Sequence, residues 1–279
     1  MSHVEPFRVG DVEIAVLCQG WAPLPLADES TGHDVDWARE RRTFPWAFDG
    51  DAHWQWHVQA FIVRTPSGLT MVDAGLGGNR PVAPWAPGTG LTAEQAYEDA
   101  DLDPSEVSTV VLTHMHPDHS GGIRASDGEP RFPNSRHVLH PADWAFLAED
   151  QLSEFSAQGR PGLHRVHDLG MLDLGEDDRE VAPGIEVRHT PGHTPGHRSV
   201  LIHAGDEVIL LTGDLLHLPN QFANPSWGSD HDEDPDAGAR SRVAIVSAAA
   251  DGGWTVGVPH FAEPFGTVTE AGWSSRWNG

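Results

Sequence analysis

The chain contains no lysine and only one cysteine. All 17 basic residues among its 279 are arginine, which excludes Schiff-base chemistry on a lysine and the lysine of a phosphate-binding P-loop. The single Cys18 cannot form an intramolecular disulfide, which fits a reducing compartment, and a thiol mechanism would depend on it without a visible partner. No G-x-S-x-G motif offers a serine nucleophile. The sequence therefore points away from covalent catalysis.

Long apolar stretches are also missing. No run of 18 apolar residues occurs, and residues 1–6 lack the apolar segment of a signal peptide. We therefore expect a cytoplasmic protein with no membrane partner. The formal net charge is −25, which argues against nucleic acid as a partner because both carry negative charge. The acidic runs 176–178 and 230–234 are expected to be solvated surface.

Apolar strands alternate with amphipathic helices along the chain. Residues 61–64 and 69–72 predict a β-hairpin. The expected helices are 92–100, 141–152 and 236–250. This alternation indicates the layered α/β class. The strands expected to carry functional residues lie between 108 and 260, so we expect one domain that covers residues 1–279.

Residues 1–60 are rich in tryptophan and phenylalanine and show little regular periodicity. We interpret them as an N-terminal extension that is mostly an ordered loop with short helices. The segment is expected to form an apolar wall beside the functional site, or to lie in a homodimer interface, where aromatic residues are enriched. Both roles can coexist, and we expect a homodimer. The candidate pocket residues are Trp21, Trp46, Trp54 and, later in the chain, Phe222.

The run from Thr113 to Gly122 contains four metal-competent side chains within six residues. His114, His116, Asp118 and His119 follow the apolar segment 110–112 in an H-x-H-x-D-H spacing. A regular strand or helix cannot present all four to one ion, whereas a loop can fold around two ions. Imidazole and carboxylate together favour zinc, iron, manganese or cobalt. The alternative is a histidine-rich surface loop, which the spacing makes much less favoured.

Three further candidate ligands follow apolar strands in the same way. His193 comes after the strand-like segment 184–189, Asp214 after 207–211, and His260 after 254–258. In layered α/β folds, strand ends aim loop residues at a shared crevice. Four strand ends that offer only histidine and aspartate are therefore a strong signal for a metal site.

These motifs resemble the metallo-β-lactamase superfamily, and the resemblance covers most of the chain. The matching segments are 71–75, 114–119, 189–197, 213–214 and His260. The resemblance implies an αββα sandwich, in which two mixed sheets are flanked by helices, with a dinuclear metal centre. It implies that His114, His116 and His193 hold one ion, that Asp118, His119 and His260 hold the other, and that Asp214 bridges them.

The segment 212–225 resembles the branch that contains methyl parathion hydrolase and related lactonases. Acyl-homoserine lactonases share the repeated Pro-Gly-His run but typically place a tyrosine three residues after the bridging aspartate. Here that position is His217, and the only tyrosine of the chain is Tyr97. The expected substrate is a small neutral or hydrophobic ester, either a lactone or an organophosphate-type triester.

The expected chemistry follows from two divalent ions, zinc first, with manganese, cobalt or iron as alternatives. Such a pair lowers the pKa of a shared water from about 15.7 toward ~7 and supplies hydroxide at neutral pH. Asp118 and Asp214 are the expected catalytic carboxylates, and His217 is expected to orient the substrate or protonate the leaving group, or else to bond a backbone carbonyl. Asp73 is expected to fix a ligand imidazole or to form a turn. His197 is expected to be structural, and His137 and His140 are expected to be surface or packing residues.

Other enzyme classes compete with this interpretation. A mononuclear iron dioxygenase resembling persulfide dioxygenases shares the first three ligands. A thioesterase resembling glyoxalase II would need cationic residues for the glutathione carboxylates, and no basic cluster lies near the motifs. A β-lactamase is the third alternative, and a binding protein without activity is the least favoured.

Overall fold

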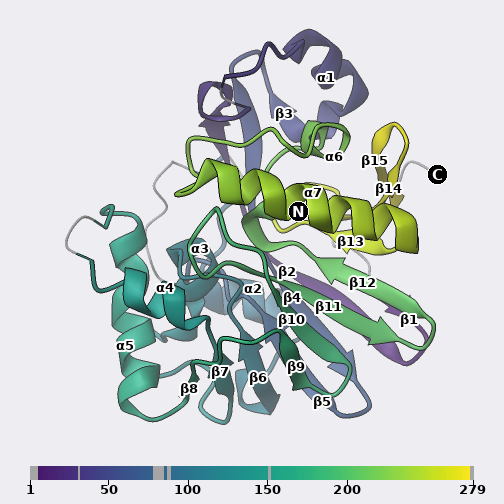
Figure 1. Ribbon diagram of the computed structural model, residues 1–279. Helices are drawn as coiled ribbons and strands as arrows, with labels where there is room; N and C mark the ends of the chain where they lie inside the picture. Colours follow the sequence, from purple (N-terminus) through teal and green to yellow (C-terminus); the bar gives the residue numbers. More distant parts are fainter. Residues whose placement is uncertain (1–5, 31, 78–84, 87–88, 150–151, 277–279) are drawn as a thin grey trace.

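The computed structural model describes residues 6–30, 32–77, 85–86, 89–149 and 152–276 (Figure 1). Two β-sheets pack face to face and carry helices on their outer faces, as the sequence predicts. In the described residues, the first sheet has eight strands in the order β1 (Phe7–Val9), β2 (Val12–Pro25), β4 (His53–Thr65), β5 (Gly68–Val72), β6 (Val107–Val111), β7 (Arg136–Val138) and β8 (Leu172–Asp173), with β3 (Phe48–Asp49) paired to β4.

The second sheet is formed by the carboxyl-terminal part of the chain. Its described strands are, in spatial order, β15 (Gly272–Ser275), β14 (Phe265–Thr269), β13 (Thr255–Gly257), β12 (Glu207–Leu211), β11 (Arg198–Ala204), β10 (Ile185–His189) and β9 (Arg179–Ala182). Both sheets are mixed, because β5 to β8 run parallel in the first and β12 runs parallel to β13 in the second. The predicted hairpin at 61–72 is confirmed as β4 and β5.

The helices are mostly short. They are α1 (Trp37–Thr43), α2 (Ala93–Asp99), α3 (Pro117–Ser120), α4 (Pro141–Phe146), α5 (Arg160–Asp168), α6 (Asn220–Ala223) and α7 (Pro235–Gly252). Single 3-10 turns are η1 (Leu26–Asp28), η2 (Pro45–Ala47), η3 (Pro104–Glu106), η4 (Gly121–Ile123), η5 (Ser156–Gly159) and η6 (Gly213–Leu215). The predicted helix 141–152 ends earlier than expected, and its positions 150–151 lie outside the described residues.

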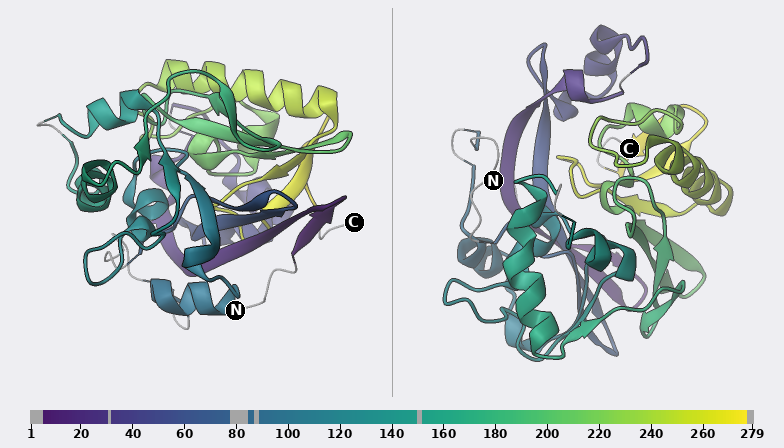
Figure 2. Two further views of the ribbon diagram at one scale, coloured as in Figure 1. Left: turned by 90° about the horizontal axis from the view of Figure 1, so that it is seen from below. Right: turned by 60° about the vertical axis from the view of Figure 1, so that its left-hand side comes forward.

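Alternation of side chains along the strands produces the four layers. In β4, Ile62 packs with α2 and α5, whereas Phe61 and Val63 face the second sheet. In β11, Ile202 joins this core between the sheets, whereas Leu201 packs against α7. The left view of Figure 2 shows the order, with α7 at the top, the two sheets below it and α2 at the bottom. Each buried Val, Leu or Ile stabilises the fold by roughly 1.5–3 kcal/mol.

The expectation of an ordered loop for most of residues 1–60 is wrong. Strand β2 has 14 residues and pairs with β4 from Glu13 opposite Arg64 to Pro25 opposite His53. The register shifts between Cys18 and Gly20, and this irregularity hides the strand periodicity in the sequence. The start of β4 does alternate, because Trp54 and Trp56 are buried on one face between polar neighbours.

The acidic run 230–234 is largely solvated, as expected, because its residues are exposed except for Asp232. Asp232 is buried, and its Oδ2 accepts a hydrogen bond from Arg242 Nη1 at 2.9 Å. Asp234 caps α7, since its side chain accepts the backbone N–H of Ala237 at 2.9 Å. Such a cap contributes about 1 kcal/mol to helix stability. Local charge density could not predict the burial of Asp232, because its partner Arg242 lies ten residues further along the chain, inside α7.

The structure predicts an acid-sensitive step at His137 in β7. The side chain has no exposed surface, and burial lowers the pKa of its imidazole from 6.5 to about 4. Above pH 6.5 the imidazole is neutral in both states. Between pH 6.5 and 4 only the unfolded chain takes up the proton, so the free energy of unfolding should fall by up to about 3 kcal/mol.

Replacing His137 with leucine should remove this contribution. The urea-unfolding free energy of the variant should fall less steeply than that of the wild type between pH 6.5 and 4. The comparison of slopes cancels the other titratable groups and any constant effect of the substitution. Equal slopes for the two proteins would show that His137 titrates alike in the folded and unfolded chains.

Candidate metal centre

The seven predicted ligands meet at one edge of the two sheets. His114 and His116 follow β6, and Asp118 and His119 lie on the short helix α3. His193, Asp214 and His260 follow β10, β12 and β13. All seven side chains are buried. Strands from both sheets therefore deliver these residues to a common site.

Three histidines form the first ligand group, His114, His116 and His193. The Nδ1 atom of His116 lies 2.9 Å from Nε2 of His193. Asp214 Oδ2 is 3.4 Å from His193 Nε2 and 3.8 Å from His114 Nε2. In a tetrahedral zinc site with Zn–N near 2.0–2.1 Å, ligand atoms lie about 3.3 Å apart, so these spacings suit one ion.

The second ligand group contains Asp118, His119, Asp214 and His260. Asp214 Oδ1 lies 3.0 Å from the Nε2 atoms of both His119 and His260. Asp118 Oδ2 is 3.2 Å from His119 Nε2 and 3.6 Å from His260 Nε2. Because Oδ1 of Asp214 faces this group and Oδ2 faces the first, its carboxylate lies between the two.

Several of these atoms lack any hydrogen bond. The Nε2 atoms of His114, His119 and His260 and Oδ1 of Asp214 are buried and have no hydrogen-bond partner in the part of the chain that the structure describes. Leaving buried polar atoms unpaired costs roughly 1–3 kcal/mol each. Divalent cations at both groups would satisfy all of them, so the residues fit a metal centre with two ions.

The protonation states of His114, His116 and Asp214 agree with this fit, whereas burial of His119 is outweighed by Asp214, Asp118 and Asp73, which raise its pKa well above its usual value. Burial lowers the pKa of His114 well below its usual value, and burial together with His193 lowers that of His116 to about 3. Burial alone would raise the pKa of Asp214, but the surrounding histidines, above all His119, hold it well below its usual range. Neutral imidazole and ionised carboxylate are the forms that bind metal.

The far ring nitrogens of two candidate ligands, His119 and His260, are held by neighbouring groups. Asp73 Oδ2 accepts from His119 Nδ1 at 2.8 Å, and its Oδ1 accepts the backbone N–H of Thr113. His260 Nδ1 donates to the backbone carbonyl of His57 at 2.6 Å. These bonds fix which nitrogen faces the centre. Asp73 also has a positive φ of 63°, so its two expected roles, turn and imidazole partner, coincide.

His197 holds the backbone of Asp214 in place. Its Nε2 accepts the backbone N–H of Asp214 at 3.0 Å, and its Nδ1 donates to the carbonyl of Thr190. Gly213 has φ 56°, and a Cβ there would lie 2.6 Å from His197 Nε2. Residue 213 must therefore be glycine, because a side chain there would displace His197 from the backbone N–H of Asp214.

Sequence reasoning missed Asp143, which joins two of the ligand loops. The side chain is fully buried in α4 and accepts the backbone N–H groups of Met115 at 2.9 Å and Gly196 at 2.6 Å. Thr194 Oγ1 donates to it at 3.0 Å. Burial raises the pKa of Asp143 to about 7 despite these bonds. No local motif marks this residue, because its partners are backbone groups of distant segments.

The predicted pocket residues fall into two sets. Trp54 stacks on the ring of His217 at 5.9 Å and meets His260 edge-on at 6.2 Å. Trp21 stacks on His57 at 6.1 Å, next to the strand segment that holds His260. Trp46 and Phe222 instead pack against Phe261, and Phe222 is buried in the core beneath α7. A contact not anticipated from the sequence is that of Trp56 with His260 at 5.8 Å.

His217 lies at the edge of both ligand groups. Its Nε2 is 3.7 Å from Asp214 Oδ2, and its Nδ1 is 3.3 Å from both carboxylate oxygens of Glu29. Burial favours the neutral imidazole, but Glu29 and Asp214 raise the pKa of His217 well above its usual value. The sequence did not indicate Glu29, which lies 188 residues away along the chain.

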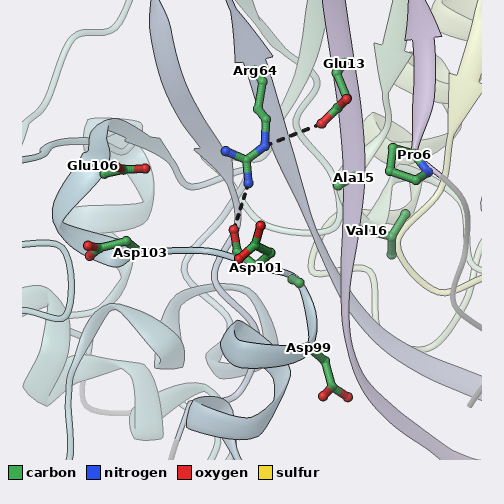
Figure 3. Close-up of a pocket in the computed structure, with 10 residues that line it drawn as sticks. Pro6, Glu13, Ala15, Val16, Arg64, Asp99, Asp101, Asp103 and Glu106 are labelled. Atoms are coloured by element: carbon green, nitrogen blue, oxygen red, sulfur yellow. Dashed lines mark hydrogen bonds and ion pairs between the residues drawn. The ribbon is translucent and has the colours of Figure 1, made fainter.

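A hollow on another part of the surface is separate from this centre. Figure 3 shows Arg64 between carboxylates, with Nε 3.5 Å from Glu13 Oε1 and Nη2 donating to the Asp101 carbonyl at 3.0 Å. None of the residues that line it is a candidate ligand. The functional site is therefore defined by the ligand geometry, and this hollow is a mainly acidic surface feature.

Comparisons with known proteins identify the family of this chain. A model of the metallo-β-lactamase superfamily matches residues 53–258. An N-acyl homoserine lactonase of Bacillus sp is 32% identical over 148 residues, 52% of this chain and 50% of the relative. N-acyl homoserine lactonase AttM of Agrobacterium fabrum is 27% identical over 183 residues, 57% of this chain and 65% of the relative. The matched part spans about half the length of the first relative and somewhat more of the second.

Solved structures share the fold over nearly the whole chain. Hydrolase AbOPH of the beta lactamase superfamily has a TM-score of 0.81 at 22% identity, covering 97% of this chain and 96% of that one. AidC, a dizinc quorum-quenching lactonase, has a TM-score of 0.80 at 20% identity with the same coverage. Among the described residues, no helix combines the length and apolarity needed to cross a bilayer. Since the family model covers most of the chain and the fold agrees, this protein belongs to the metallo-β-lactamase superfamily.

Proposed function

We propose that the protein is a metal-dependent hydrolase that uses two divalent cations to cleave a small neutral or hydrophobic ester, with a lactone as the first candidate. The observation that carries the proposal is the carboxylate of Asp214, whose two oxygens face two different ligand groups. The similarity to N-acyl homoserine lactonases supports a lactone. Trp54, whose ring contacts both His217 and His260, would form part of the apolar wall that contacts the acyl group of the substrate.

The seven ligands would hold the cations, which, when bound, would lower the pKa of a water toward ~7 and stabilise the negative charge that develops on the carbonyl oxygen of the ester. Asp214 would keep the two groups at a fixed separation. Asp118 turns Oδ2 toward the second group, and its buried Oδ1 has no hydrogen-bond partner in the described residues. This oxygen is available to accept a hydrogen bond from the attacking water. His217 would orient the substrate from the side of Glu29.

A phosphotriester is the second candidate substrate. Two observations favour it: the segment 212–225 resembles the methyl parathion hydrolase branch, and His217 stands where acyl-homoserine lactonases typically have tyrosine. A triester and a lactone are both uncharged, which suits a site whose neighbours include the carboxylates of Glu29 and Asp232. Near the ligand groups, Arg242 is paired with Asp232 and offers no free cation for an anionic substrate.

Zinc is the proposed metal, because histidine nitrogen and aspartate oxygen are common zinc ligands in catalytic sites. Manganese, cobalt and iron are compatible with the same ligands.

A homodimer remains a prediction from the sequence, and the mass measured by light scattering tests it. The aromatic segment that suggested a dimer interface packs largely within its own chain, since Phe48, Trp54 and Trp56 are buried in one cluster.

Metal analysis and a substrate panel test the proposal directly. We expect two equivalents of metal per chain, hydrolysis of lactones or aryl esters, and loss of activity with a chelator that zinc restores. The panel should include a paraoxon-like triester, a thioester, a persulfide and a β-lactam. Exclusive turnover of the thioester or the β-lactam, or one equivalent of iron with persulfide oxidation, would contradict the proposal.

The Asp73→Asn variant tests the support of the second ligand group. Asparagine tolerates the positive φ at this position but cannot accept the His119 N–H as a carboxylate does. We expect affinity for the second metal equivalent to fall about 10- to 100-fold, measured by competition with a chelating dye. Asp206→Asn removes the same charge at an exposed turn and should leave both affinities unchanged. Unchanged affinity in the Asp73 variant would separate it from metal binding.

The His217→Gln variant tests the role of this residue on the substrate side. We expect kcat to fall about 100-fold, as for loss of one hydrogen-bond donor that acts in the transition state, while metal content stays at the wild-type level. His203→Gln, an exposed histidine on β11, is the control. Full kcat/KM in the His217 variant would remove it from the mechanism.

A further inference from the structure

We propose that Glu29 is a positioning residue that holds the imidazole of His217 with its Nε2 facing the reaction centre. This inference rests on the proposed hydrolytic function. It adds a residue from the amino-terminal part of the chain on which the reaction depends. The carboxylate of Glu29 has no exposed side-chain surface and lies at 3.3 Å, through both oxygens, from Nδ1 of His217. Nε2, on the opposite side of the ring, is 3.7 Å from Asp214 Oδ2.

The remaining freedom of the His217 ring is restricted by its neighbours. Its backbone N–H donates to Gln221 Oε1 at 2.7 Å, and the same oxygen accepts the N–H of Leu218 at 3.0 Å. Trp54 stacks on the ring at 5.9 Å with 15° between the planes. Gln221 therefore fixes the backbone and Trp54 fixes the ring plane, which leaves the in-plane direction of the ring nitrogens to Glu29.

Glu29 occupies its position independently of His217. It follows η1, where Leu26 N–H donates to the Ala52 carbonyl at 2.9 Å. It forms an antiparallel bridge with Ser229, and Asp230 N–H donates to the Asp28 carbonyl at 2.9 Å. The carboxylate is thus delivered by a backbone tied at both sides. Its position therefore does not depend on His217, and it can fix the orientation of the His217 ring.

A purely structural role does not require a carboxylate at this point. A buried charge pays a desolvation penalty that an apolar side chain of similar size avoids, so replacing it with well-packed apolar groups is often neutral or stabilising. Accepting an imidazole N–H selects the nitrogen that faces the other way. Asp73 holds His119 in the same way, because its carboxylate accepts from His119 Nδ1. Glu29 repeats it for a histidine that is not among the seven ligands.

For the reaction, the consequence is that His217 is held in a fixed orientation beside the ester bond that is hydrolysed. In ester hydrolysis, a bond forms from the water oxygen to the carbonyl carbon, the bond from that carbon to the alkoxy oxygen breaks, and the alkoxy oxygen ends with a proton from the attacking water. The carboxylate at Nδ1 favours the ring with a proton on both nitrogens, so Nε2–H of His217 would donate to one of the substrate oxygens as negative charge grows on that oxygen. A ring turned away would lose this contact in the transition state, with little effect on ground-state binding.

A double-mutant cycle tests the proposal. Glu29→Ala should lower kcat about 10-fold on the best lactone or ester, with KM and the two metal equivalents unchanged. In the His217→Gln background, the same change should cost nothing further, because Glu29 acts through His217. Glu29→Gln, which keeps one acceptor oxygen, should recover part of the loss. Asp28→Asn removes the same charge from the preceding residue and should match the wild type.

Imidazole nitrogen NMR makes the test independent of activity. In the zinc-loaded protein, the resonances that vanish in His217→Gln belong to His217, and we expect a proton on Nδ1 that is lost or shared in Glu29→Ala. An equal loss of kcat in both backgrounds, or an unchanged His217 spectrum, would overturn the proposal. If Glu29→Ala does not fold, Glu29→Gln takes its place in the cycle. If no ester is hydrolysed, the proposed function fails while the spectrum still decides the role of Glu29.

Discussion

The carboxylate of Asp214 lies between two groups of histidines, and the rest of the site depends on how the chain leaves β12 to place it there. Gly213 turns the backbone with a positive φ, and His197 holds the Asp214 N–H. The two carboxylate oxygens of Asp214 then point in different directions. Oδ1 lies 3.0 Å from the Nε2 atoms of His119 and His260, and Oδ2 lies 3.4 Å from Nε2 of His193. Without this division, the seven ligands would form one crowded cluster rather than two groups suited to separate ions.

Holding such a cluster in the absence of charge compensation is costly, because buried imidazoles and carboxylates lose their hydration. The fold meets this cost with rigid supports. Asp143 joins the loops after β6 and β10 by accepting from Met115 and Gly196, and Asp73 joins the end of β5 to His119. These supports accept hydrogen bonds from the backbone as well as from ligands. The site is therefore preorganised by the edges of the two sheets.

The amino-terminal part of the chain completes the site instead of extending away from it. Strand β4 brings Trp54 onto His217 and provides the His57 carbonyl for His260. The turn after η1 brings Glu29 to the other side of the same ring. In the right view of Figure 2, these purple and blue segments rise beside the green carboxyl-terminal sheet. Substrate preference in this protein is thus expected to depend on residues 20–60 as much as on the ligand loops.

The sequence by itself determined the layered α/β class and indicated the seven candidate ligands, because strand periodicity, the H-x-H-x-D-H spacing and the residues that follow apolar strands are local properties. It also singled out His217 and Asp73 from their neighbours. The tertiary structure alone decided that residues 12–25 pair with β4, that Asp232 is buried with Arg242, and that Phe222 packs in the core. It alone brought Glu29 to His217 and Asp143 to two ligand loops. These contacts join segments far apart in the chain, often through backbone groups, and no local pattern encodes which distant partner a side chain will meet.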